Sequence, residues 1–328
     1  MSIEKSSKSL SIIGYAFGHG AKIHSTRKAP SYLQHKYQLI ARVQEAGIEA
    51  KWIKTISLLM ERVESIPETI TDEIAIGRNH LYVMKHVSAL ADSLYELISG
   101  PDAPSGGFGR IDTVPVVIGG DHSSAIGTFS AVTHAYNAAN RFGVIYIDAH
   151  MDSHTVITSP SKRYHGMPLS ILLGESRQQD LASLLYSGKK LHPEHLVLVG
   201  VRSYEDGEEK LIKDKGIKVV PATEVNEQGF SPVAEEALKV ATNGTVGFGV
   251  SIDLDAFDPS YAPGVGTPES GGMRFDDDTK AGLAKMFTHP MFKVLEIVEF
   301  NPELDRDDTT ANMILEILKL CGRSQNSK

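Results

Sequence analysis

The sequence predicts an α/β fold of three layers, in which helices cover both faces of a mostly parallel, doubly wound central sheet. Short apolar runs rich in Val, Ile and Tyr recur along the chain and are apolar on both faces, as expected for buried parallel strands. Segments of helical character lie between these runs, and this alternation is typical of doubly wound domains. Because no stretch is long enough to be an interdomain linker, we expect residues 1–328 to form a single domain.

The predicted strands are the apolar runs, in which β-branched residues dominate. They are residues 11–17, 114–120, 142–148, 196–201, 217–223, 247–255 and 294–300. The predicted helices lie roughly at residues 72–98, 124–140, 168–186, 232–243, 277–287 and 308–321. Two stretches rich in Gly, Pro and Ser, at 99–108 and 259–272, separate elements as loops.

The composition limits the classes of function. The formal net charge is −8, so this mildly acidic chain is a poor candidate for binding a phosphate backbone, and we expect no nucleic-acid partner. No apolar run reaches the ~20 residues of a membrane span, so we expect no membrane partner. Cys321 is the only cysteine, which excludes an internal disulfide and favours a reducing compartment. We therefore expect a cytoplasmic protein.

Carboxylate and imidazole groups follow three of the predicted strands, at the edge where open α/β sheets bind ligands. They lie in the motifs GGDHS, DAHMD and SIDLDAFDP, which contain His122, Asp148, His150, Asp152, Asp253 and Asp255. A single acidic residue at a strand end is usually a helix cap, but here three strand ends each carry such groups. Because crowded, buried carboxylates need compensating charge, the pattern predicts a site for divalent cations.

The spacing and chemistry of these residues indicate which cation. Residues i, i+2 and i+4 of a strand point to one face, so Asp148, His150 and Asp152 can be aimed at a common point. Two histidines and four aspartates form an oxygen-rich set, which suits manganese better than zinc, because zinc favours sulfur and nitrogen. Six ligands with shared carboxylates suit two metal ions ~3.5–4 Å apart.

These three motifs resemble the metal motifs of the ureohydrolase family, which comprises arginases, agmatinases and formimidoylglutamases. The resemblance extends from the first predicted strand to near the C-terminus. The segments HGMPLSILL at 165–173, GVRSYEDGE, PGVGTPESGG and VEFNPELD look most like arginases. The resemblance implies a hydrolase that cleaves the guanidinium group of L-arginine to urea and ornithine, and a homo-oligomer that is a trimer or a hexamer.

The resemblance also implies a role for each motif residue. One of two Mn²⁺ ions per subunit would bind His122, Asp148, Asp152 and Asp253. The other would bind His150, Asp148, Asp253 and Asp255. Asp148 and Asp253 would bridge the ions, with a hydroxide between them as the nucleophile. Glu299 would pair with the substrate guanidinium, and His165 would shuttle protons. Asp152 would serve catalysis as well as metal binding, and Thr267 would line the substrate pocket.

Two positions depart from the arginase pattern, and both belong to the amino-acid end of the substrate. His154 stands where arginases usually have an asparagine that contacts the α-carboxylate, and Glu205 stands where they have an aspartate for the α-amino group. Ser161 matches a serine that contacts the carboxylate. An imidazole can still meet a carboxylate and Glu205 an ammonium group, so arginine is the first choice of substrate. Agmatine, another guanidino acid and formiminoglutamate are the alternatives.

Two unrelated classes of function are alternatives to this interpretation. Dimetal phosphoesterases also use Asp and His at strand ends, but they normally add an Asn-His ligand element, and the sequence has no GNH. A metal-stabilised scaffold without activity would be expected to have lost a ligand or Glu299, and every one of these residues is present. The sequence therefore favours an enzyme, with the non-catalytic scaffold as the alternative.

Overall fold

The computed structural model describes residues 8–58, 73–100, 113–176, 181, 183–185 and 188–323. The strands are β1 (Ser9–Tyr15), β2 (Ala50–Ile56), β3 (Thr113–Ile118), β4 (Phe142–Ile147), β5 (Leu196–Val201), β6 (Lys218–Pro221), β7 (Gly247–Asp253) and β8 (Phe292–Val298). They form one eight-stranded sheet in the order β2-β1-β3-β8-β7-β4-β5-β6, and each neighbouring pair is parallel. The predicted parallel sheet is confirmed, and it is parallel throughout.

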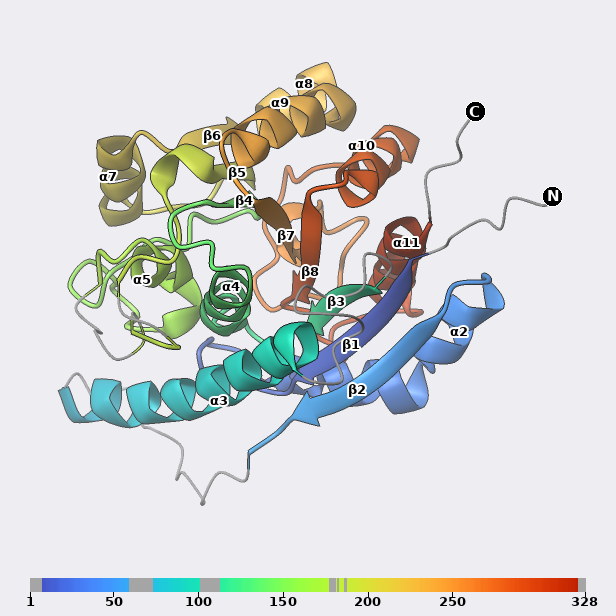
Figure 1. Cartoon of the computed structure of the whole chain (residues 1–328), viewed down its shortest axis with the longest axis horizontal. Helices are drawn as coiled ribbons and strands as arrows, with labels where there is room; N and C mark the ends of the chain where they lie inside the picture. The colour runs from blue at the N-terminus through green and yellow to red at the C-terminus, as the bar shows by residue number, and fades with distance from the viewer. Residues whose placement is uncertain are drawn as a thin grey trace.

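Helices cover both faces of the sheet, so the three-layer prediction is also confirmed (Figure 1). One face carries α3 (Glu73–Ser99), α4 (Ser124–Ala135), α5 (Pro168–Leu172) and α7 (Asp206–Lys215). The other face carries α1 (Ala29–Ser31), α2 (Leu39–Glu45), α8 (Ala222–Gln228), α9 (Phe230–Thr242), α10 (Asp277–Thr288) and α11 (Thr309–Gly322). Within the described ranges, no helix combines the length and the apolar character that crossing a membrane requires.

Alternate residues of each central strand face the two helical layers. On β4, Val144 and Tyr146 belong to the core beneath α3 and α4, whereas Ile145 and Ile147 belong to the core on the opposite face. All four side chains have no exposed surface. This burial on both faces is the physical reason for strand sequences that are continuously apolar rather than alternating.

Among the strands and α-helices of the described residues, five were not predicted: β2, α1, α2, α7 and α8. α1 and α2 are short, with three and seven residues, and the other three have polar sequences. β2 pairs with β1 alone at the edge of the sheet, and its residues Lys51 and Lys54 are exposed. An edge strand is covered on fewer sides, so it lacks the apolar run that marks a central strand. α7, with the sequence DGEEKLIKDK, buries only Glu208 and Ile212, and α8 buries only two residues. Such short, charged helices leave little hydrophobic periodicity to detect.

The predicted helix at residues 168–186 is too long. α5 ends at Leu172, and Gly174 adopts a positive φ of 74°, the left-handed conformation that commonly follows a helix end. Part of the remaining prediction, at 177–180, 182 and 186–187, lies outside the described residues. The predicted strand at 217–223 is also too long, because β6 ends at Pro221 and α8 begins at the next residue.

Four neighbouring strands, β3, β8, β7 and β4, bring the sequence motifs to one edge of the sheet. Because these strands are parallel, their carboxyl ends lie at the same edge of the sheet. The motifs GGDHS and DAHMD directly follow β3 and β4, and SIDLD and VEFNP overlap the last residues of β7 and β8. The turn after β3 also lies directly against the turn after β1. A Cβ on Gly120 would lie 1.8 Å from the carbonyl oxygen of Phe17, so only glycine permits this approach.

Candidate active site

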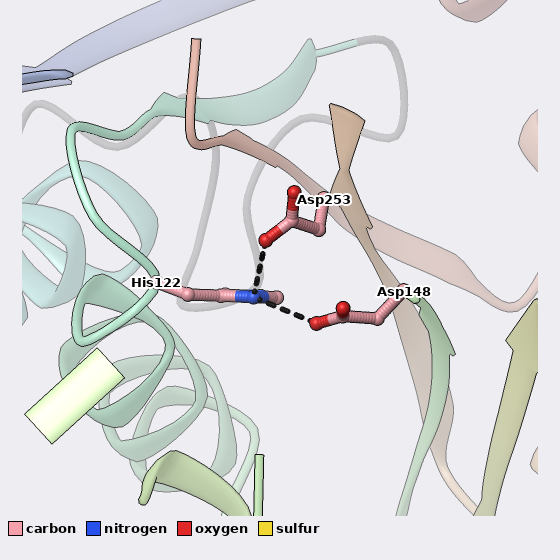
Figure 2. A group of neighbouring side chains, drawn as sticks. All are labelled: His122, Asp148 and Asp253. Atoms are coloured by element: carbon pink, nitrogen blue, oxygen red, sulfur yellow. Dashed lines mark ion pairs between the residues drawn. The ribbon is translucent and has the colours of Figure 1, made fainter. Parts of the chain in front are cut away.

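His122 is the centre of a buried group of carboxylates. Its Nδ1 atom lies 3.1 Å from Asp148 Oδ2, 3.1 Å from Asp152 Oδ2 and 3.3 Å from Asp253 Oδ2. Figure 2 shows the imidazole edge pointing between the carboxylates of Asp148 and Asp253, which come from the ends of two neighbouring strands. The His122 and Asp148 side chains have no exposed surface. Residues from three predicted motifs therefore meet at one point.

A second group shares Asp148 with the first. His150 Nδ1 lies 3.4 Å from Asp148 Oδ1 and 3.2 Å from Asp255 Oδ2. The two oxygens of Asp148 thus face different histidines, and each group brings its candidate ligand atoms within 4.8 Å of one another. The side chain of His150 is 26% exposed, so the second group lies closer to solvent than the first. Asp148 lies between the two groups, and the bridging roles that the resemblance implies for Asp148 and Asp253 both stay predictions.

The convergence comes from turns after the strands, and the expected strand alternation is wrong for these residues. β4 ends at Ile147, and β7 ends at Asp253 itself. Asp148 Oδ1 accepts the backbone N–H of His150 at 2.7 Å. Asp253 Oδ1 accepts the backbone N–H of Asp255 at 2.9 Å, in a 3₁₀ turn. Short aspartate side chains that bond the backbone two residues on favour such turns, so the same residues both shape the turn and supply ligand atoms.

Crowding of charge shifts the pKa values across both groups. Burial and the neighbouring carboxylates of Asp152 and Asp255 raise the pKa of Asp148. Burial and the charges of Asp255 and Asp148 raise the pKa of Asp253 well above its ordinary range. Burial alone would lower the pKa of His122, but its contacts with the three aspartates raise it well above the ordinary value. Without added positive charge these groups retain protons, and a bound cation would replace that compensation.

Unpaired buried atoms indicate where a cation would bind. His122 Nδ1 and Asp148 Oδ2 are both buried, and neither makes a hydrogen bond within the part of the chain that the structure describes. Buried polar atoms are normally satisfied, so such a pair needs a partner. Imidazole nitrogen together with several carboxylate oxygens is a donor set for a divalent transition metal. The residues therefore fit the predicted metal site.

His165 and Glu299 lie beside the first group. His165 Nδ1 is 3.5 Å from Glu299 Oε1, and the same oxygen accepts the backbone N–H of His122 at 2.9 Å. Glu299 directly follows β8 and has a positive φ of 62°, and Asp152 has a φ of 46°. Residues other than glycine rarely adopt this left-handed conformation, and such strain is concentrated at functional sites. Burial opposes protonation of His165, but contact with Glu299 raises its pKa.

Asp121 fixes the wall beside His165 and was not predicted as a functional residue. Its Oδ2 accepts the backbone N–H of Gly20 at 2.7 Å, and its Oδ1 accepts that of Ser123 at 3.0 Å. The carbonyl oxygen of Gly20 accepts the backbone N–H of His165 at 3.1 Å. Burial, together with the charge of Glu299, raises the pKa of Asp121 to about 6. Its place beside His122 in GGDHS was the available signal, but its partners are distant in the sequence.

Thr267 lies at the second group, and its implied role in lining the substrate pocket stays a prediction. Its hydroxyl donates to Asp255 Oδ2 at 3.0 Å. Arg202, which was not predicted, holds the surrounding backbone: its guanidinium donates to the carbonyl oxygens of Gly200, Asp255, Ala256, Glu269 and Ser270 at 2.6–3.2 Å. A planar guanidinium with five donors can tie the turn after β7 to the loop that carries Thr267, which a lysine cannot.

His154, Glu205 and Glu208 form a third group at the start of α7. His154 Nε2 lies 2.6 Å from Glu205 Oε2 and 3.4 Å from Glu208 Oε2, and its Nδ1 lies 3.1 Å from Thr158 Oγ1. Glu208 accepts the backbone N–H groups of Ser153 and Glu205 at 3.2 and 3.1 Å. Burial is the main cause that raises the pKa of Glu208 to about 8. None of the orphaned buried atoms found in the described residues belongs to this group, so its side chains form a hydrogen-bonded cluster that differs in this respect from the first group.

Two of the three residues that were predicted to bind the substrate tail contact each other. They are His154 and Glu205, and their side chains are 7% and 60% exposed. Ser161 is exposed, and its hydroxyl accepts the backbone N–H of Arg163 at 3.3 Å. The roles of all three residues in substrate binding stay predictions.

Known proteins share both the sequence and the fold of this chain. The model of the Arginase family matches residues 8–321. The arginase of Bacillus caldovelox is 37% identical over 270 residues, which cover 79% of this chain and 87% of that protein. The arginase of Bacillus subtilis strain 168 is 31% identical, covering 95% and 97%. The crystal structure of arginase from Bacillus cereus superposes with a TM-score of 0.81 at 30% identity, covering 98% of this chain and all of that one. The family model covers nearly the whole chain, and a relative at 31% identity covers 95% of it. The chain therefore belongs to the Arginase family.

Proposed function

We propose that the protein hydrolyses L-arginine to urea and ornithine. The observation that carries the proposal is the carboxylate of Asp148, which joins two histidine–aspartate groups next to Glu299 and His165. Relatives named arginases, at 31–37% identity, support arginine as the substrate. Two departures at the tail end, His154 and Glu205, keep agmatine or another guanidino acid as the alternative.

The metal is proposed to be manganese, with two ions per subunit. His122, Asp148, Asp152 and Asp253 would hold one ion, and His150, Asp148, Asp253 and Asp255 the other. Bound there, the ions would supply Lewis acidity and lower the pKa of water toward neutrality. The buried carboxylates supply the negative charge that favours two divalent cations over one. The predominance of oxygen donors supports manganese over zinc.

Glu299 and His165 are proposed to handle the guanidinium group and the protons. A carboxylate accepts two parallel N–H bonds from a planar guanidinium, so Glu299 would fix the orientation of the reacting carbon. The left-handed backbone at Glu299 and its bond to the N–H of His122 restrict where the carboxylate points. His165 lies near enough to exchange a proton with the same region, and the departing amine needs a proton to leave.

The His154–Glu205 pair is proposed to recognise the tail of the substrate. An α-amino acid carries an ammonium and a carboxylate on neighbouring atoms, and an imidazole beside a carboxylate is complementary to that arrangement. Glu205 would accept from the ammonium group, and His154 would lie near the carboxylate. Ser161 would add a hydroxyl to the same end.

We also propose the cellular context that the sequence indicated. The single cysteine, Cys321, is buried, and burial raises the pKa of its thiol to about 12, which agrees with a structural rather than a redox role. A cytoplasmic homo-oligomer, a trimer or a hexamer, is the assembly that family analogy supports. Residues 1–328 would form one domain in each subunit.

The first test is the reaction itself. Purified protein supplied with Mn²⁺ should release urea and ornithine in equal amounts from L-arginine, measured by a colorimetric urea assay and by chromatography of the amine. The same assay with agmatine, 4-guanidinobutyrate and formiminoglutamate ranks the alternatives. Release of formamide from formiminoglutamate, with no urea from arginine, would overturn the proposal.

The second prediction concerns the shared ligands. Asp148→Asn and Asp253→Asn should each lose bound metal and activity together, because an amide lacks the charge that offsets the cation. Metal content is measured by mass spectrometry. Asp258→Asn is the matched control, since Asp258 belongs to the same motif but its carboxylate accepts from Ser260 and Gly271 in an exposed loop. Two metals retained in both ligand variants, with activity intact, would contradict the assignment.

The third prediction separates proton transfer from metal binding. His165→Ala should lower kcat by ~10²–10⁴-fold, the usual contribution of general acid–base catalysis, while the metal content stays unchanged. The comparison variant is His122→Ala, which should lose metal. If His165→Ala also loses a metal ion, His165 is a ligand and its proposed role is wrong.

The fourth prediction concerns the tail. Agmatine has no carboxylate, and a hydrogen bond to a charged group is worth roughly 1.5–3 kcal/mol, so agmatine should have a kcat/KM about tenfold or more below that of arginine. His154→Asn should keep or improve arginine turnover. Equal kcat/KM for both substrates, unchanged by substitution at His154 and Glu205, would show that the pair does not read the tail.

A further inference from the structure

Glu296 is a carboxylate with no exposed surface, on β8 one strand away from the metal-site turn of β7. Three hydroxyl groups donate to it. Ser124 and Thr128, both on α4, donate to Oε1 at 2.9 and 2.6 Å, and Ser251 on β7 donates to Oε2 at 2.8 Å. All three bonds therefore run toward Glu296, which is the acceptor in each of them.

The direction of these bonds determines how His122 is protonated. The hydroxyl of Ser251 donates its single proton to Glu296, so it can only accept a hydrogen bond from His122. His122 Nε2 lies 2.9 Å from this oxygen and therefore carries the proton. In a neutral imidazole the other nitrogen, Nδ1, then presents its lone pair, and Nδ1 is the atom that faces Asp148, Asp152 and Asp253.

The opposite tautomer is penalised by the same contacts. With the proton on Nδ1, the Nε2 lone pair would require Ser251 to turn its hydroxyl toward His122. Glu296 Oε2 would then lose the hydroxyl donor of Ser251 inside the core, and an unsatisfied buried acceptor is costly. The ring is also held in plane: it stacks on Tyr146, with centroids 4.5 Å apart and an interplanar angle of 5°, and the Tyr146 hydroxyl donates to Asp152 at 2.8 Å.

We propose that Glu296, acting through Ser251, is a positioning residue that holds His122 in the tautomer able to ligate a metal ion. The inference rests on the proposed metal site, because a lone pair on Nδ1 among three carboxylates is stable only beside a cation. It assigns a function to two buried residues, Glu296 and Ser251, that are not among the six proposed metal ligands. Hydrogen-bonded partners of metal-ligating histidines typically contribute 10–100-fold to metal affinity.

The contacts of Glu296 provide a matched pair of variants. Ser251→Ala removes the link to His122 and leaves both bonds from α4. Thr128→Val removes one α4 bond and leaves the link to His122. Each variant deletes one hydroxyl donor to the same buried carboxylate, so a merely structural role of Glu296 predicts the same result for both.

The experiment titrates metal-free protein with Mn²⁺ alone and measures free Mn²⁺ by electron paramagnetic resonance, with urea unfolding of the metal-free proteins in parallel. Wild type should bind two ions. Ser251→Ala should weaken one of them by ~10–100-fold, and Glu296→Gln should do the same. Thr128→Val should change the affinity less than about threefold, although it destabilises the metal-free fold as much as Ser251→Ala does.

The outcomes distinguish this inference from the proposal beneath it. A wild-type protein that binds no Mn²⁺ would overturn the metal site and the inference together. Two ions in wild type, with equal affinity in Ser251→Ala and Thr128→Val, would overturn the inference alone. If Glu296→Gln does not fold, Ser251→Ala and Thr128→Val still decide the question.

Discussion

Asp148 lies in the interior of the protein between two histidines, and each of its oxygens faces a different one. Around it, within a few ångströms, are three further aspartates on the turns that end two strands. Such a concentration of buried negative charge is unstable by itself, because ionised carboxylates lose hydration and repel one another. The raised pKa values of Asp148 and Asp253 are the direct consequence. Bound cations would offset this charge, so the constraint that shapes the site is the compensation of buried charge.

Hydrogen bonds from the surrounding residues at this edge of the sheet hold the carboxylates in place. Backbone N–H groups of His150 and Asp255 orient the carboxylates two residues before them, and Arg202 ties the turn after β7 to the loop with Thr267. Glu296, on β8, orients His122 through the hydroxyl of Ser251. Few of these groups are free to rotate, because their donors and acceptors are already committed. Preorganisation of this kind keeps a metal site in one geometry.

The group that is proposed to recognise the substrate tail differs from the two groups that are proposed to bind metal. His154, Glu205 and Glu208 satisfy one another and the backbone at the start of α7, and no orphaned atom is found among them in the described residues. The groups that are proposed to bind metal are therefore organised around unpaired buried atoms, whereas His154, Glu205 and Glu208 form a hydrogen-bonded cluster of their own. The two departures from the arginase pattern, His154 and Glu205, both lie in this cluster.

The sequence was sufficient to predict the layers, the parallel sheet and which histidines and aspartates cluster at its edge. Central strands of a parallel sheet are buried on both faces and are therefore apolar throughout, and groups of Asp and His at three strand ends are more than helix capping requires. The sequence did not reveal β2 or α7, because an edge strand and a short charged helix carry no hydrophobic pattern. The tertiary structure alone decided the partners: Asp121 bonds Gly20, Glu296 reaches His122 through Ser251, and His154 pairs with Glu205. These contacts join residues 45 to 129 positions apart, and only the packing of strands and turns brings them within hydrogen-bonding distance.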